Sequence, residues 1–228
     1  KTIQKLSLKL DNLRKTKNRK RKELEQVPHL IQVVERSFNT SCLPTIVEED
    51  QSFAGVCAEL SLQLCALNRE AHFYHSAVKA CKQGVHLATI ASMKQTKAWD
   101  KGDEFAALRM RGKAALARAY GDIFQYDKSL QVMKDIHAAF GPDVPMAARF
   151  VLMDLHCELL LCSGDVHMSL MTYEKAFGSL NINRSIQNLR RHIELIDASM
   201  SARPPPPLDV RRAMLERRKE TVKSLLRV

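Results

Sequence analysis

The sequence predicts an all-α protein built from antiparallel helical hairpins that stack on one another. Two observations predict this fold. The residue pattern of positions 119–133 recurs in phase at positions 159–173, forty residues later, and each copy has the pattern of a helix, a tight turn and a second helix. The chain also contains only eight Gly and eight Pro, which leaves few breakers for a β-rich fold. Because two short helices cannot bury their apolar face alone, such hairpins must stack.

The two copies align through a small residue followed by leucine. Ser129-Leu130 of the first copy corresponds to Ser169-Leu170 of the second. A third, fainter copy around Ala77-Val78, within residues 59–84, lies 52 residues before the first clear one. The spacing therefore predicts three hairpins along the centre of the chain.

The pattern resembles the tetratricopeptide repeat (TPR), whose first helix carries a Leu-small pair and then an aromatic residue, and whose second helix opens with a small residue. The positions that carry this resemblance in the first clear copy are Leu116, Ala117, Tyr120 and Ser129, with Pro142 near the family's helix-ending proline. Those in the second copy are Cys157, Leu160, Ser169, Tyr173 and Ala176, with His156 where Leu is usual. The resemblance covers roughly residues 55–200 and implies a TPR-like right-handed solenoid with additional terminal helices. The family's usual repeat is about 34 residues, so the spacings here indicate longer helices.

The resemblance also implies a groove lined by the first helices of successive hairpins. The family's partner-binding positions fall on Arg111 and Arg118 in the first clear copy and on Asp154 and Glu158 in the second. Separations of seven and four residues put each pair on one helical face, so the groove would be cationic on one hairpin and anionic on the next. The two zones could instead pair with each other, which stabilises little when exposed. The Lys and Asn pattern with which some family members clamp a peptide's terminal carboxylate is missing.

The chain divides into five segments. They are a basic amphipathic N-terminal helix at residues 1–25, an irregular connection with a short helix at 26–52, the repeat domain at 53–202, a proline linker at 203–207 and a basic C-terminal helix at 208–228. No run of about 18 uncharged apolar residues occurs, which excludes a membrane-spanning helix.

Helix-breaking glycine and proline residues, together with acidic residues, predict the helix ends within the repeat domain. One helix is expected to begin near Ser52 or Phe53. Residues 102–104, a glycine followed by two acids that suit the positive end of a helix, predict a long helix that ends near Gly121. Residues 141–144 form the clearest turn, and Pro145 suits the first position of the next helix.

The positive charge of the chain lies in its two terminal segments. The net charge is +11, but residues 26–207 carry 19 basic and 19 acidic side chains. The basic cluster of the N-terminal segment consists of Lys17, Arg19, Lys20, Arg21 and Lys22. It is typical of a nuclear-import signal, of a nucleic-acid backbone contact, of a site for an acidic partner, or simply of a solvated helix end. No aromatic residue is interleaved with it, which disfavours single-stranded nucleic acid.

The C-terminal segment is set off by four prolines that cannot continue a helix. Its basic residues are Arg211, Arg212, Arg217, Arg218 and Lys219, with Lys223 beyond them. Stacked repeats need a cap over the last apolar face. The helix therefore either packs back on the last hairpin or docks on another protein.

The sequence contains no catalytic motif and predicts neither a metal site nor a cofactor. The six cysteines, at positions 42, 57, 65, 81, 157 and 162, form no Cys-x-x-Cys pair. Their scatter among apolar residues predicts reduced, buried thiols of a cytoplasmic or nuclear protein. His72 and His75 share a helical face, with Cys81 further along, but no acidic or cysteine partner falls at metal-ligand spacing. Packing of residues 72–75 between hairpins is the simpler interpretation.

These features favour a non-enzymatic adaptor or scaffold, a subunit that holds protein partners of a larger complex by its groove and its terminal helices. The alternative is a component of a nucleoprotein complex that contacts RNA or DNA through the basic terminal segments, and its binding would weaken steeply with salt. A third hypothesis, an enzyme with a site near His72, His75 and Cys81, predicts that the purified protein contains metal.

Overall fold

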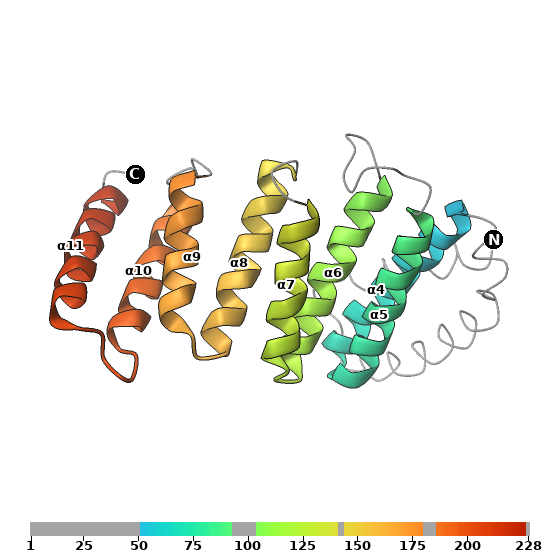
Figure 1. Cartoon of the computed structure of the whole chain (residues 1–228), viewed down its shortest axis with the longest axis horizontal. Coiled ribbons are helices and arrows are strands. Elements are labelled where there is room, and N and C mark those ends of the chain that lie inside the picture. The colour runs from blue at the N-terminus through green and yellow to red at the C-terminus, as the bar shows by residue number, and fades with distance from the viewer. Residues whose placement is uncertain (1–50, 93–103, 141–143, 180–185, 227–228) are drawn as a thin grey trace, which may run out of the picture. The chain divides into compact units, whose positions relative to one another are not determined.

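The computed structural model describes residues 51–92, 104–140, 144–179 and 186–226, and every regular element in these ranges is an α-helix (Figure 1). The helices are α4 (Gln51–Glu70), α5 (Tyr74–Ala91), α6 (Glu104–Asp122), α7 (Tyr126–Phe140), α8 (Met146–Cys162), α9 (Val166–Ser179), α10 (Ile186–Met200) and α11 (Leu208–Leu225). The predicted all-α fold is confirmed. The predicted helix at residues 1–25, its basic cluster, and residues 26–50 of the connecting segment lie outside the described residues.

The helices form two compact units, divided between Asp143 and Val144. The first unit contains α4 to α7, and the second contains α8 to α11. In the first unit α5 packs against both α4 and α6, and α6 packs against α7. In the second unit α9 packs against both α8 and α10, and α10 packs against α11 (Figure 1). Each unit therefore consists of two stacked helical hairpins.

Three hairpins share one turn geometry, which shows the register of the repeat. His72, Phe124 and Gly164 each have a left-handed backbone, with φ of 62°, 60° and 88°. The next amide in each turn donates to the carbonyl five residues earlier: Phe73 to Asn68 at 2.7 Å, Gln125 to Tyr120 at 3.0 Å and Asp165 to Leu160 at 2.9 Å. These turns are spaced by 52 and 40 residues. The fainter third copy is therefore a hairpin in the register that the sequence predicts.

A buried serine joins the two helices of each clear repeat. The hydroxyl of Ser129 donates to the carbonyl of Ala117 at 2.6 Å, and the hydroxyl of Ser169 donates to the carbonyl of Cys157 at 2.8 Å. Both serines are fully buried. A small residue is needed here because the helices approach closely, and the hydrogen bond removes the cost of burying the hydroxyl.

The first hairpin joins its helices by a disulfide instead, between Cys65 of α4 and Cys81 of α5. The position of the serine is taken by Ala77, which cannot donate a hydrogen bond. The expectation that all cysteines are reduced thiols is therefore wrong for this pair, because the stacking of α4 on α5 brings together two residues that are sixteen positions apart in the sequence. Disulfides persist in oxidising compartments, so one argument for a cytoplasmic or nuclear location is lost.

Cys57, Cys157 and Cys162 are not disulfide-bonded. Cys57 and Cys157 are buried, as predicted, whereas Cys162 is exposed at the end of α8. Burial raises the pKa of Cys157 to about 12. The Cys157 thiol is therefore protonated at neutral pH and unreactive.

Each unit has its own apolar core. In the first unit α4 supplies Ala54, Cys57, Leu60, Leu64 and Leu67. Gly84 lets α5 approach α4, because a Cβ atom there would lie 2.9 Å from Cδ2 of Leu62. In the second unit the core contains Met153, Leu170, Tyr173, Leu195, Ile196 and Met214.

The helix ends agree with the sequence to within one or two residues. The first described helix begins at Gln51, and α6 spans Glu104–Asp122, close to the predicted boundaries. Pro145 is the N-cap of α8, with φ of −54° and ψ of 142°, and is not its first residue. That expectation is wrong by one position, because the extended ψ of Pro145 places it just outside the helix.

Reduction of the Cys65–Cys81 bond is expected to destabilise the first unit. A disulfide that closes a loop of this size contributes about 3 kcal/mol, largely by restricting the unfolded chain. Urea denaturation with and without a reducing agent, followed by circular dichroism, measures the difference. The double variant Cys65→Ala/Cys81→Ala is the control, since its unfolding should not respond to the reductant. If the unfolding of the oxidised wild-type chain is equally insensitive to the reducing agent, the Cys65–Cys81 bond does not form.

Candidate functional site

The two arginines predicted to line the groove lie on one exposed face of α6. Nη2 of Arg111 donates to Oε2 of Glu59 on α4 at 2.9 Å, and the two side chains are 60% and 39% exposed. Arg118 is exposed two turns further along α6. An ion pair this exposed contributes at most about 1 kcal/mol. A carboxylate of a binding partner could therefore displace Glu59 at little cost.

The two acidic residues predicted to line the groove lie on α8 in the second unit, and Asp154 borders a hollow of about 650 Å³. Oδ1 of Asp154 lies 3.8 Å from Nε of Arg191 on α10, and Glu158 is exposed one turn further along α8. The hollow is lined by Phe150, Asp154, Tyr173, Asn188, Arg190, Arg191 and Glu194. Residues of α8 and α10, the first helices of two hairpins, thus contribute to one surface. Arg111 and Asp154 are compensated by Glu59 and Arg191 of their own units.

Three of the five cations predicted on the C-terminal helix are held in ion pairs. Arg217 donates to Glu174 of α9 at 2.6 Å, Arg218 donates to both oxygens of Asp197 of α10 at 2.6 and 3.2 Å, and Lys219 donates to Glu216 at 2.6 Å. Arg211 and Arg212 are exposed. Arg217 and Arg218 therefore fix α11 to its unit, whereas the Lys219 pair lies within α11 and Arg211 and Arg212 face solvent.

A polar network around His192, which the sequence did not predict, links α10 to α9 and α11. Nε2 of His192 lies 3.2 Å from Oε1 of Glu174, and Nδ1 lies 3.2 Å from Oγ1 of Thr221. The ring stacks on Tyr173 with centroids 5.8 Å apart. Burial raises the pKa of Glu174, but the hydrogen bond from His192 and the charge of Arg217 outweigh it and hold that pKa below its usual value. The network positions α11.

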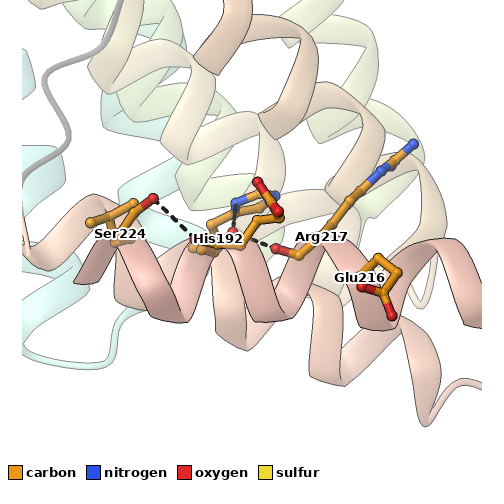
Figure 2. A pocket seen from close by; sticks show the side chains of 7 residues that line it. His192, Glu216, Arg217 and Ser224 are labelled. Atoms are coloured by element: carbon orange, nitrogen blue, oxygen red, sulfur yellow. Dashed lines mark hydrogen bonds between the residues drawn. The ribbon is translucent and has the colours of Figure 1, made fainter. Parts of the chain in front are cut away.

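A hollow of about 490 Å³ opens beside this network, between α10 and α11 (Figure 2). Its lining consists of Leu189, His192, Glu216, Arg217, Glu220, Thr221 and Ser224. Arg217 and His192 are both committed to Glu174. The hollow therefore offers few groups that could bind a ligand.

Aromatic side chains gather where the turns of the two hairpins of the first unit meet. We name His72, Phe73, Tyr74, His75 and Phe124 the tip cluster. They line a hollow of about 620 Å³, together with Ser76, Asp122 and Ile123. Arg69 of the first hairpin forms an ion pair with Asp122 of the second, which joins the two turns beneath the cluster.

The expectation that residues 72–75 pack between hairpins is wrong. His72, Phe73 and His75 are exposed. The reason is the turn itself, which ends where α5 begins at Tyr74, so these residues lie beyond the stacked faces of the helices. Nδ1 of His72 lies 2.7 Å from the hydroxyl oxygen of Tyr74, which orders the exposed His72 ring against the half-buried Tyr74 ring.

Phe124 combines two unfavourable properties. Its backbone is left-handed, which costs a residue with a Cβ atom roughly 1–2 kcal/mol, and its side chain is 80% exposed. The ring makes an edge contact with Tyr126, with centroids 6.2 Å apart. The equivalent residue of the second unit is Gly164, which adopts the left-handed backbone without strain. The signal was present in the sequence, because the repeat aligns Phe124 with Gly164.

The metal-site hypothesis at His72, His75 and Cys81 fails, because Cys81 is bonded to Cys65. Within the described ranges no group of three or more His, Cys, Asp and Glu side chains is placed to hold a metal ion. Among the described helices, none has the length and apolar character needed to cross a membrane.

Phe124→Gly is expected to leave the first unit as stable as before or more stable. Relief of the left-handed strain gains roughly 1–2 kcal/mol, and the greater freedom of unfolded glycine loses about 0.5–1 kcal/mol. The converse change, Gly164→Ala, should destabilise the second unit by about 1 kcal/mol, because alanine is strained in the left-handed backbone. No steric clash adds to this cost, since the new methyl group meets open space. Urea denaturation of both variants measures the effects. A loss above about 2 kcal/mol for Phe124→Gly would show that the ring packs as a core residue does.

The His192 network is expected to make the stability of the second unit depend on pH. The pKa of Glu174 is lower in the folded unit than in the unfolded chain. Its carboxylate therefore stabilises the fold above the unfolded pKa of about 4.3, and this contribution disappears as the pH falls through the folded pKa. Glu174→Gln should lower the free energy of unfolding by about 1–2 kcal/mol at neutral pH. Denaturation at a series of pH values should show this difference shrinking below about pH 4. Glu220→Gln, at an exposed position of α11, is the control; a pH-independent effect of Glu174→Gln would contradict the prediction.

Comparison with known proteins supports the fold. No protein-family model and no curated protein sequence matches the chain. Two crystal structures of a Podosopora anserina protein, described as a kinesin light chain with nearly identical TPR-like repeats, match with TM-scores of 0.65; the second is a point variant. They are 11% and 12% identical to this chain, cover 100% of it, and are themselves covered to 98% and 99%. At this identity the likeness concerns the fold alone. The chain has the TPR-like helical-repeat fold that its sequence pattern resembles.

Proposed function

We propose that this chain is a non-enzymatic adaptor or scaffold that holds protein partners as one subunit of a larger complex. The TPR-like fold supports this proposal, because stacked hairpins present extended surfaces to other proteins. The observation that carries it is the exposed and strained Phe124 in the tip cluster.

Contact with another protein explains the presence of Phe124. Residues in sparsely populated backbone conformations concentrate at functional sites. Burying a phenylalanine side chain in an interface stabilises by about 1.5–3 kcal/mol, which offsets the backbone strain. Phe73, 44% exposed on the same hollow, is a second apolar anchor. The tip cluster therefore suits an apolar side chain of a protein partner.

The residues predicted to line the groove supply further polar contacts in each of the two units. We assign Arg111 and Arg118 on α6 to the contact of the first unit, and Asp154 and Glu158 on α8 to that of the second. The ion pairs of Arg111 with Glu59 and of Asp154 with Arg191 hold two of these side chains in place. Charges at the rim of an interface contribute to specificity and to the association rate more than to affinity.

Contact with RNA or DNA through the basic terminal segments is the competing function. It predicts that affinity falls steeply with salt, and that neutralising Lys17, Arg19, Lys20, Arg21 and Lys22 reduces this dependence. The ion pairs of Arg217 with α9 and of Arg218 with α10 reduce the charge that α11 can offer to phosphates. We therefore favour protein partners.

The test compares the proteins captured by the tagged full chain, by Phe124→Gly and by a matched control, Met168→Ser. Met168 is an exposed apolar residue near the equivalent turn of the second unit. We expect Phe124→Gly to reduce recovery of a specific partner about tenfold or more, and Met168→Ser to retain it. Quantitative mass spectrometry after nuclease treatment measures the recovery. Equal recovery with Phe124→Gly, or capture abolished by nuclease, would contradict the proposal.

A further inference from the structure

The outward face of α11 carries a row of exposed leucines. Leu208, Leu215 and Leu226 are 67%, 45% and 81% exposed. Their separations of seven and eleven residues correspond to two and three helical turns, so the side chains lie within about 20° of one line along the helix. Leu226 has helical backbone just beyond the last residue of α11, so the row continues to the end of the helix.

This row is distinct from the face by which α11 packs on its own unit. Met214 and Thr221 are buried, and Val210 packs against the core that contains Tyr173 and Ile196. On a regular helix these three α11 positions lie more than about 100° from the leucine row. Because α10 runs beside α11 on the packed side (Figure 1), the leucines are directed away from the unit.

Exposed cations flank the leucine row on both sides. Helical spacing places Arg211 on one side and Arg212 and Lys223 on the other, while Lys219 lies within about 20° of the row itself, between Leu215 and Leu226. One carboxylate borders the same face, that of Glu216, which accepts a hydrogen bond from Lys219 at 2.6 Å. The face therefore combines a narrow apolar row with an excess of positive charge.

We propose that this face of α11 binds an acidic amphipathic helix of a partner protein. The proposal rests on the scaffold function proposed above and names the chemistry of one partner, at a surface in the other unit. Leucines repeated every two or three turns suit the apolar seam between two packed helices. The flanking arginines and lysines then face Asp and Glu residues on either side of the partner's seam, and such pairs set partner choice and orientation.

Charge and shape argue against two other occupants. A second copy of this chain would bring two positively charged faces together, which disfavours a symmetric α11–α11 contact. A lipid surface requires a broad apolar face that sinks into the membrane interface. Here a row one residue wide is bordered by Arg211 and Arg212, so little apolar surface could enter the membrane.

The test selects helical peptides that bind the full chain. The library consists of 18-residue helices displayed on phage, in which one face varies among Leu and Ala and the flanking positions vary among Glu, Lys and Ser. We expect enrichment of sequences with a leucine row flanked by Glu. Fluorescence anisotropy then measures the affinity of a synthetic selected peptide, with a second peptide in which Lys replaces each Glu as its control.

Variants of α11 link the binding to this face. Leu215→Ser and the double variant Arg211→Glu/Arg212→Glu should each weaken peptide binding about tenfold or more. Two exposed residues of the second unit provide matched controls: Val151→Ser for the leucine and Lys175→Glu for the charges. Both controls should bind as the wild type does. All five positions are exposed, and unchanged circular dichroism melting curves will confirm that the variants fold.

Three outcomes would overturn the proposal. The first is a library that enriches no acidic helix. The second is peptide binding that survives both α11 variants. The third is binding of a 20-base-pair RNA duplex, or of vesicles containing phosphatidylserine, that is lost with Arg211→Glu/Arg212→Glu while peptide binding is absent. Phe124→Gly should retain full peptide binding, so failure at α11 and failure of the proposed scaffold function at the tip cluster are separately detected.

Discussion

The structure depends on one left-handed residue in three of the four hairpin turns of the described residues. Two helices that are joined by three residues can pack against each other only if the chain reverses sharply, and His72, Phe124 and Gly164 provide this reversal. The amide that follows each of them then satisfies a carbonyl at the end of the first helix, as in the Schellman motif. These three hairpins reverse the chain with the same backbone conformation, whereas their side chains at the left-handed position have little in common.

The contact inside each hairpin follows from that turn, because the turn sets which residues of the two helices face each other. Ser129 and Ser169 meet a carbonyl of the preceding helix and bind it. Where Ala77 replaces the serine, Cys65 and Cys81 cross-link the same two helices. The repeat thus conserves close approach between the helices and varies the chemistry that holds them.

The surfaces separate into those whose charges are satisfied within a unit and those that remain open. The charges of Arg111, Asp154 and Arg217 are compensated by ion pairs within their own units. The His192 network fixes α11 against α9 and α10. The tip cluster differs, because Phe124 is strained and exposed without a gain in folding. The leucine row of α11 differs in the same way, because apolar side chains stand among cations and face solvent. Open surfaces of this kind are where a scaffold meets other proteins.

The sequence by itself determined three of the four described hairpins and the spacing of their turns, because helical periodicity and turns are local properties that a repeat displays twice or more. It did not predict the hairpin of α10 and α11. It placed Arg111 and Asp154 on the first helices of their hairpins. It did not show that Glu59 and Arg191 would compensate them, nor that Cys65 would bond to Cys81. Those outcomes depend on which residues of separate helices come into contact, and only the tertiary structure decides that.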